Sequence, residues 1–136
     1  MKILGIDYGE RRTGIAKSDL LGITAQGIGT VKHKTPEEAL EQIVEIIKTE
    51  NPEKIVLGLP KNMDGSVGFR GEATRKFADM LKEKTDIPVI FWDERLTTVS
   101  AIRTLNERNV RGEKRKNVID TVAAAYILQN YLDSLA

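Results

Sequence analysis

The chain contains no cysteine, one histidine (His33) and one tryptophan (Trp92). Without cysteine it has neither disulfides nor thiolate metal sites, which fits a reducing compartment, and we expect a cytoplasmic protein. No apolar run approaches the roughly 20 residues that a membrane-spanning helix needs. The N-terminal strand pattern already carries Asp7 and does not fit a signal peptide, so we expect no membrane partner.

Neither sign of charge dominates, since 21 basic and 20 acidic residues give a net charge of +1. This excludes a polycation, so any nucleic-acid binding must come from local patches. One patch, RGEKRK, carries Arg111, Lys114, Arg115 and Lys116. A solvated loop would have the same composition, but the patch precedes the helix that carries Asp120, so we expect it to contact a nucleic-acid backbone. The few aromatic residues form no ladder for stacking bases, which favours recognition of backbone or shape.

A length of 136 residues favours one domain, here residues 1–136. Strand patterns joined by short turns, typical of an antiparallel meander, cover 2–8, 13–19 and 25–32. Helices and strands then alternate: helices at 35–50 and from Phe69 onward, strands at 54–60 and 87–94, and helices at 97–108 and 117–135. This order predicts an α/β fold with a mixed five-stranded sheet flanked by helices.

Two of these helices carry detailed expectations. Thr35, Pro36 and Glu38 are typical of a capped helix start with a capping box. The helix from Phe69 is expected to place Phe69 on one apolar face together with Phe77. His33, at the exit of the third strand, is interpreted as a surface residue.

Acidic residues stand at the ends of the first and last predicted strands and near the start of the last helix: Asp7, the pair Asp93 and Glu94, and Asp120. Ligands of mixed α/β sheets tend to bind beyond the carboxyl ends of parallel strands, so these acids are expected to converge there. Clustered carboxylates repel one another unless a cation lies between them, and oxygen ligands favour Mg²⁺ or Mn²⁺. Two such ions about 4 Å apart support phosphodiester hydrolysis by a metal-activated water.

Each acid also has a structural interpretation. Asp7 could simply form a turn, and the pair Asp93 and Glu94 could end a solvated strand beside Arg95. The alternation of the strand does not decide which member of the pair points inward.

Asp120 could stabilise the N-terminus of its helix, with Asn117 as the N-cap. Against this, Ala123 and Ala124 share its face and would let the helix approach the sheet closely, bringing Asp120 toward the strand ends.

Four motifs occur in order along nearly the whole chain: GIDYGERRTGIA, GLPKNMDGS, DERLTT and RKNVIDTVAAAYIL. With these motifs the sequence closely resembles the YqgF (RuvX) family, which has a ribonuclease H-like fold related to Holliday-junction resolvases. The resemblance implies a divalent-metal nuclease that matures the 5′ end of pre-16S ribosomal RNA. It also implies that Asp7, Glu94 and Asp120 are the catalytic metal ligands, with Asp93 as the alternative to Glu94.

One departure from the wider resolvase group concerns the fourth strand, near whose end those enzymes place an acid. Here the strand ends VLGLP, and no acid follows until Asp64 in the loop. The acid stands in the neighbouring strand instead, which leaves the metal geometry and the number of ions open.

Basic side chains also follow the strand ends. Arg11 and Arg12 come in the turn after Asp7, and Arg95 follows Glu94. We expect Arg11 and Arg12 to contact a phosphate backbone, although simple turn charges would look the same in the sequence. Arg95 either pairs with an acid or binds phosphate. The NMDGS turn at the end of the fourth strand could also hold substrate.

Three further functions fit parts of the pattern. A resolvase of four-way DNA would need two sites about a symmetry axis, and the sequence leaves monomer and homodimer open. GIDYG also resembles the phosphate loop of the actin, hexokinase and heat-shock ATPase group, but no second glycine-rich phosphate loop follows a later strand. A non-catalytic RNA-binding module is disfavoured, because clustered carboxylates repel phosphate unless metal is present.

Overall fold

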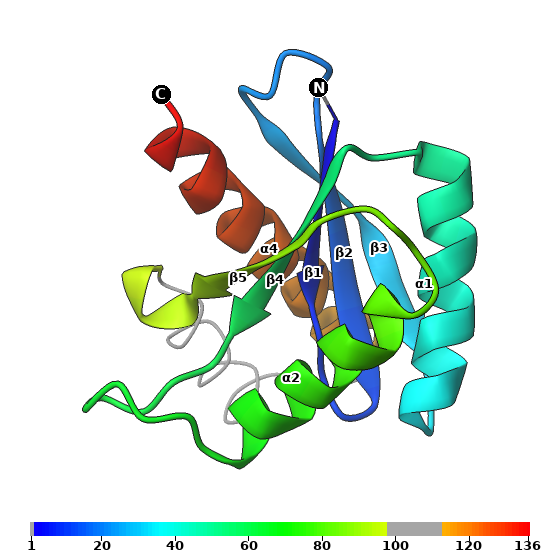
Figure 1. Cartoon of the computed structure of the whole chain (residues 1–136), viewed down its shortest axis with the longest axis vertical. Coiled ribbons are helices and arrows are strands. Elements are labelled where there is room, and N and C mark those ends of the chain that lie inside the picture. Colours follow the sequence, from blue (N-terminus) through cyan, green and yellow to red (C-terminus); the bar gives the residue numbers. More distant parts are fainter. Residues whose placement is uncertain (1, 98–112) are drawn as a thin grey trace.

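The computed structural model describes residues 2–97 and 113–136, with side chains in the second stretch from Val118 onward. Five strands form one sheet in the order β3-β2-β1-β4-β5 (Figure 1). Their bounds are β1 (Ile3–Asp7), β2 (Arg12–Ser18), β3 (Ala25–Lys32), β4 (Lys54–Leu59) and β5 (Val89–Asp93). The first three strands are antiparallel, whereas β4 and β5 run parallel to β1. The predicted mixed sheet is therefore confirmed.

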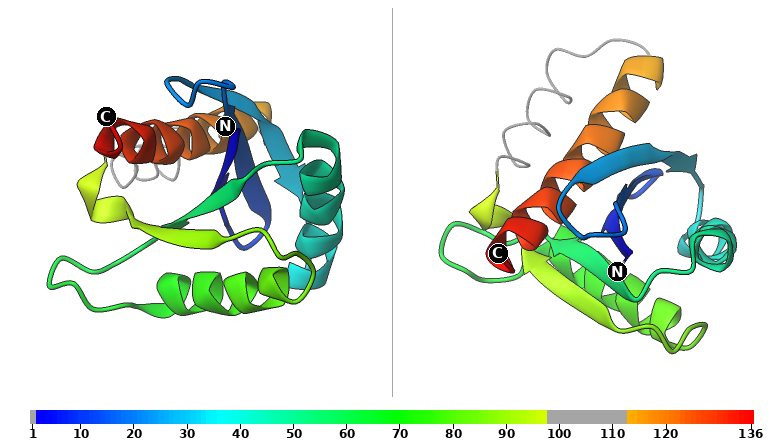
Figure 2. Two further views of the ribbon diagram at one scale, coloured as in Figure 1. Left: turned by 45° about the horizontal axis from the view of Figure 1, so that its top comes forward. Right: turned by 90° about the horizontal axis from the view of Figure 1, so that it is seen from above.

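Helices cover both faces of this sheet, as the two turned views make plain (Figure 2). The described helices are α1 (Pro36–Glu50), α2 (Phe69–Lys82), the 3₁₀ turn η1 (Glu94–Leu96) and α4 (Glu113–Ser134). Helices α1 and α2 pack over one face, with Leu4 and Ile6 of β1 in their core. Helix α4 packs over the other face, against Ile3 of β1. Alternate residues of β1 thus serve two cores, as expected of a central strand.

Helix α1 begins as predicted. The Thr35 hydroxyl accepts a hydrogen bond from the Glu38 backbone N–H at 3.2 Å, and Pro36 occupies the first helical position. The Glu38 carboxylate accepts from the backbone N–H of Lys34, one residue before the cap, at 2.7 Å.

Two expectations about helices are wrong. Phe69 does not join the buried face of α2, since it is 87% exposed while Phe77 is buried. The last helix begins at Glu113, so Asn117 lies inside it and is not its N-cap. The helix expected over 97–108 falls almost entirely outside the described residues.

Helix α4 lies unusually close to the sheet because the sheet presents glycines to it. A Cβ on Gly14 would collide with the backbone carbonyl of Asp120, and a Cβ on Gly5 would meet Leu128 at 2.7 Å. Ala123 and Ala124 are buried at this interface, which confirms the expected close approach. The backbone of Asp120 is therefore held directly over β2.

No helix within the described part of the chain is both long and apolar enough to span a membrane.

Candidate active site

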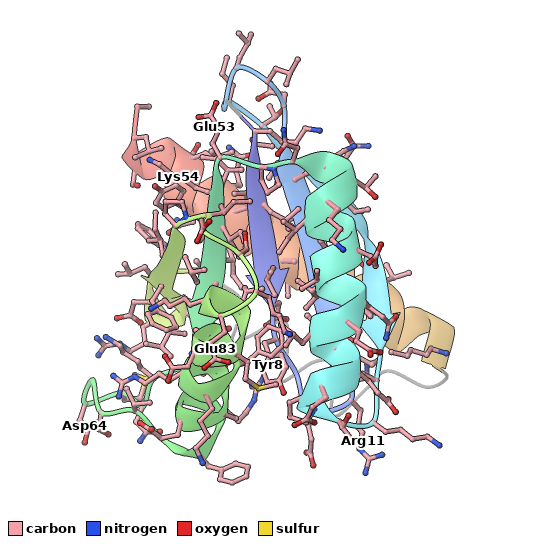
Figure 3. The ribbon with its side chains drawn as sticks, turned by 45° about the vertical axis from the view of Figure 1, so that its right-hand side comes forward. Tyr8, Arg11, Glu53, Lys54, Asp64 and Glu83 are labelled. Carbon is pink, nitrogen blue, oxygen red and sulfur yellow. The ribbon has the colours of Figure 1, made fainter. Side chains whose placement is uncertain are left out.

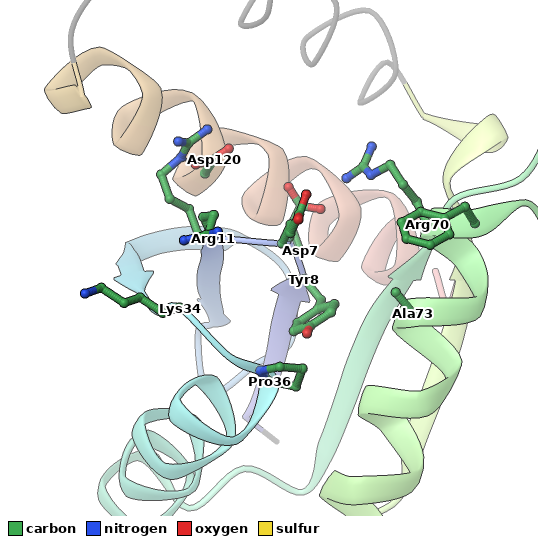
Figure 4. A pocket seen from close by; sticks show the side chains of 12 residues that line it. Asp7, Tyr8, Arg11, Lys34, Pro36, Arg70, Ala73 and Asp120 are labelled. Atoms are coloured by element: carbon green, nitrogen blue, oxygen red, sulfur yellow. Dashed lines mark hydrogen bonds and ion pairs between the residues drawn. The ribbon is translucent and has the colours of Figure 1, made fainter.

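A cleft of about 630 Å³ lies at the carboxyl end of β1. It is bounded by the turn after β1, the first residues of α1 and α2, and one side of α4 (Figure 4). Tyr8 and Arg11 lie at the same end of the molecule, opposite Glu53 and Lys54 (Figure 3). The charged side chains that line the cleft are Asp7, Glu10, Arg11, Arg12, Lys34, Arg70 and Asp120. Acidic and basic groups thus share one concave surface.

Asp7 is the last residue of β1 and is 5% exposed. Leu4 and Ile6 fill the α1 and α2 side of the sheet, so alternation turns Asp7, like Gly5, toward α4. In the sheet it stands opposite Gly14, the same glycine on which the backbone of Asp120 rests. This buried position does not suit a solvated turn residue.

Asp120 lies about two turns inside α4, too far from the helix start to act as a capping residue. Its Oδ2 accepts a hydrogen bond from Nε of Arg12 at 2.6 Å, which forms an ion pair across 108 residues of sequence. Both side chains are partly accessible from the cleft. The helix-capping interpretation of Asp120 is therefore wrong.

The neighbours Asp93 and Glu94 have opposite environments. Asp93 caps η1 by accepting from the Arg95 backbone N–H at 2.9 Å, and its Oδ2 lies 2.8 Å from Arg95 Nη2 and 3.7 Å from Lys61 Nζ. The hydrogen bonds from the Arg95 side chain lower the pKa of Asp93. In the sheet, Asp93 stands opposite Leu59, the last residue of β4. The Asp93 carboxylate therefore forms ion pairs with Arg95 and Lys61.

Glu94 is 1% exposed and lies beside Gly58 and Ile127, on the α4 side of the sheet. Burial raises the pKa of Glu94 to about 7; nearby Asp93 also raises it and Arg70 opposes the rise. The geometry thus resolves the alternation that the sequence left open, because Glu94 points inward and Asp93 does not.

The three acids offer only carboxylate oxygens, a donor set that suits Mg²⁺ or Mn²⁺. A cation would also favour the ionised form of buried Glu94. Asp7 and Asp120 line the cleft, whereas Glu94 is not among its lining residues. Within residues 2–97 and from Val118 onward, no three acidic or histidine side chains come close enough together to hold one ion. The donor chemistry suits a metal, but the expected convergence of all three acids is not found among the described side chains, because Glu94 lies outside the cleft and Asp120 is paired with Arg12.

The basic residues that the sequence indicated have different positions. Arg11 and Arg12 line the cleft. Arg95 pairs with Asp93 and donates from Nη1 to the Met63 carbonyl at 3.4 Å, so it supports the loop 60–68. Arg111 lies outside the described residues, and the side chains of Lys114, Arg115 and Lys116, at the start of α4, do as well.

The NMDGS segment is a turn, as its composition indicated. Asp64 Oδ1 accepts from both the backbone N–H and the hydroxyl of Ser66, at 2.9 and 2.6 Å, and Gly65 has a φ of 89°.

Sequence reasoning missed two basic side chains of the cleft and misplaced His33. Arg70 begins α2 and Lys34 precedes α1, so each reaches the cleft from a helix start. An arginine just after the loop at a strand's carboxyl end was the available signal for Arg70.

His33 is buried, not on the surface: its Nε2 lies 2.8 Å from the Thr13 hydroxyl and its ring stacks against Tyr8.

The mixed sheet, the helices on both faces and the carboxylates at the strand ends define the class of ribonuclease H-like α/β folds. RuvC of Thermus thermophilus, solved in complex with a Holliday junction substrate, matches with a TM-score of 0.60 and 12% identity over 98% of this chain and 94% of that chain. The fowlpox virus resolvase, solved with Holliday junction DNA, matches with a TM-score of 0.54 and 14% identity over 99% of both chains. At these identities the likeness shows the fold alone.

The chain belongs to the RuvX family, whose model, described as Holliday junction resolvase, matches residues 1–134. Two similar relatives carry the name "Putative pre-16S rRNA nuclease". The relative from Halothermothrix orenii is 56% identical over 98% of this chain and 95% of its own length. The relative from Staphylococcus haemolyticus is 51% identical over 98% of this chain and 96% of its own length.

Proposed function

We propose that this protein is a metal-dependent nuclease that hydrolyses phosphodiester bonds in structured RNA and processes the 5′ end of pre-16S ribosomal RNA. Membership of the RuvX family and the names of its close relatives support this proposal. The observation that carries it is the cleft, where three carboxylates, those of Asp7, Glu10 and Asp120, share one concave surface with four basic side chains at the end of the central strand. A nuclease of ribosomal RNA would work in the cytoplasm.

In this proposal Asp7, Glu94 and Asp120 are the catalytic groups and hold Mg²⁺ or Mn²⁺. The bound ion supplies positive charge for the phosphate and lowers the pKa of a water molecule. Glu94, whose pKa of about 7 leaves it partly protonated at neutral pH, must ionise to serve as a ligand.

The basic side chains of the cleft orient the substrate. Arg11, Lys34 and Arg70 approach from three different elements, so together they can hold consecutive phosphates across Asp7. Such contacts read the backbone and carry no sequence information.

The first test is cleavage of a 5′-labelled pre-16S ribosomal RNA fragment with and without Mn²⁺, by wild type and Asp7→Asn. We expect metal-dependent cleavage by the wild type and its loss in the variant, because the amide cannot supply an anionic ligand. The variant should remain folded, since Asn has nearly the same size and shape as the buried Asp7. Undiminished cleavage by a folded Asp7→Asn variant would contradict the assignment.

Resolution of four-way DNA is the second candidate, favoured by the family's description and by the fold shared with two junction resolvases. A four-way DNA junction belongs beside the RNA in the same assay. Paired incisions, together with a dimer in sedimentation at the assay concentration, would support this candidate. Metal-independent binding of RNA without cleavage would instead indicate a binding module.

A further inference from the structure

Arg12 stands where a metal nuclease would need a cation. Its guanidinium Nε lies 2.6 Å from Asp120 Oδ2, and both side chains line the cleft with Asp7. A guanidinium bound to one carboxylate neutralises part of the repulsion between acids that share a site. Arg12 therefore supplies Asp120 with a positive charge from the protein itself.

The pair is not needed to dock α4 on the sheet. The backbone of Asp120 already rests against Gly14, and the hydroxyls of Thr121 and Thr30 lie 2.7 Å apart one residue further on. Gln129 also ties α4 to the backbone N–H of Ala25 at 2.9 Å. With packing and hydrogen bonds holding the helix, an ion pair at the cleft wall adds little to the attachment.

The two partners differ in their freedom to move. Asp120 has a short side chain on a helix that is packed against the sheet. Arg12 begins β2, where its backbone pairs with Lys32, but its long side chain is 28% exposed and faces a cleft of about 630 Å³. An exchange of partners therefore needs only a rotation of the Arg12 side chain, with no shift of any element.

We infer that Arg12 is an exchangeable counterion: it neutralises Asp120 while the site lacks its metal, and the incoming divalent cation displaces it toward the substrate phosphate. This inference rests on the proposed function, since it requires Asp120 to be a metal ligand. It explains why an arginine, and not an apolar or neutral side chain, meets Asp120 at the wall of the cleft. Metal loading and capture of the phosphate are thereby coupled through one side chain.

The test measures Mn²⁺ binding by calorimetry, with the 136-residue chain and without nucleic acid. Arg12→Gln removes the competitor, so its dissociation constant for Mn²⁺ should fall by roughly three- to tenfold relative to wild type. Arg11→Gln is the matched control, because it removes the same charge from the same cleft but keeps the ion pair between Arg12 and Asp120. Its effect should be clearly smaller, and Arg12→Lys should lie between Arg12→Gln and wild type.

A second arm measures binding of a labelled RNA hairpin in EDTA and in Ca²⁺, another cation that prefers oxygen ligands. Arg11→Gln should weaken RNA binding similarly in both buffers. Arg12→Gln should weaken it several-fold more in Ca²⁺ than in EDTA, because Arg12 becomes available to phosphate only after the metal takes Asp120.

Equal Mn²⁺ affinities for folded Arg12→Gln and Arg11→Gln would overturn the inference and leave the proposed function standing, provided Asp120→Asn loses Mn²⁺ binding. A wild-type protein that neither binds Mn²⁺ nor cleaves RNA with it would overturn both. Thermal melting establishes folding, and Arg12→Lys carries the comparison if Arg12→Gln does not fold.

Discussion

At the scale of single residues, Glu94 is the most unusual of the three acids. Its carboxyl group is 1% exposed and points into the interior beside α4. Its neighbour Asp93 is stabilised in ionised form by Arg95, so two adjacent acids have pKa values that are shifted in opposite directions. Environments that separate the pKa values of neighbouring acids are typical of active sites. Glu94 is therefore the residue whose charge state should control the site around neutral pH.

Replacing Glu94 by Gln should change how stability depends on pH. The pKa of Glu94 rises from 4.5 to about 7 on folding, so between these values the folded state keeps a proton that the unfolded state has lost. Wild-type stability from this group is present at low pH and falls as the pH rises through 7. Near pH 8 without metal, Glu94→Gln should be more stable than wild type by roughly 3 kcal/mol, and the difference should vanish near pH 4.5.

Urea unfolding in EDTA at several pH values measures this difference. Exposed Glu45→Gln is the control and should leave the pH dependence unchanged. A constant gap between wild type and Glu94→Gln across this pH range would show that Glu94 titrates normally.

At the scale of elements, the site depends on how closely α4 approaches the sheet. Gly14 faces the backbone of Asp120 directly, so Gly14→Ala must push α4 away from β2. We expect a loss of stability of roughly 1–3 kcal/mol, together with loss of metal-dependent cleavage, because Asp120 moves with the helix. Gly68→Ala is the control, since its Cβ would meet only the end of the Asn62 side chain. Chemical denaturation and the cleavage assay measure both effects; a fully active, fully stable Gly14→Ala variant would contradict the packing argument.

A second prediction at this scale concerns His33, which fixes the turn between β1 and β2. Its backbone N–H donates to the Arg11 carbonyl at 3.0 Å and its ring contacts the Thr13 hydroxyl. Burial lowers the pKa of His33 below 6.5, Arg11 lowers it further, and Glu38 and the Thr35 backbone oppose the shift. Below pH 6.5 the unfolded state therefore binds a proton that the folded state resists, and wild-type stability falls on acidification.

His33→Phe keeps a ring beside Tyr8 but removes the bond to Thr13. At neutral pH it should cost about 1 kcal/mol of stability. This cost should shrink as the pH falls below 6.5, because only the wild type is destabilised by acid at this position. Urea unfolding of both proteins, compared at each pH, separates this effect from the opposite one of Glu94. A cost that grows on acidification would refute the assignment.

At the scale of the whole molecule, balanced charge makes nucleic-acid binding a local property. The basic segment Lys114, Arg115 and Lys116 belongs to the first turn of α4, the helix that carries Asp120, and in the proposed function it adds phosphate contacts to those of the cleft. Neutralising Lys114, Arg115 and Lys116 together should weaken RNA binding and lower the salt slope by about 0.7–0.9 for each phosphate that the protein no longer neutralises. Neutralising three lysines of α1 and α2, Lys48, Lys76 and Lys82, is the control. An unchanged slope would mean that the basic segment is only a solvated surface.

Much of the fold was determined by the sequence itself. The period-two pattern of β1, with Leu4 and Ile6 on one side and Ile3 and Asp7 on the other, already specifies a strand between two cores, because side chains alternate across a sheet. The cap at Thr35 and the apolar run of β4 likewise indicate their elements through local chemistry. Even the carboxylate of Asp7 at the strand end is visible in the linear pattern.

How these residues meet depends on the packing of segments that lie far apart in the sequence. Whether Asp93 or Glu94 points inward depends on η1 and on Arg95, which no periodicity reveals. The burial of His33, the exposure of Phe69 and the pairing of Arg12 with Asp120 depend on contacts between distant segments. Periodicity specifies which face a side chain occupies, but the partner on that face comes from another part of the chain, and its distance is set only when the layers pack.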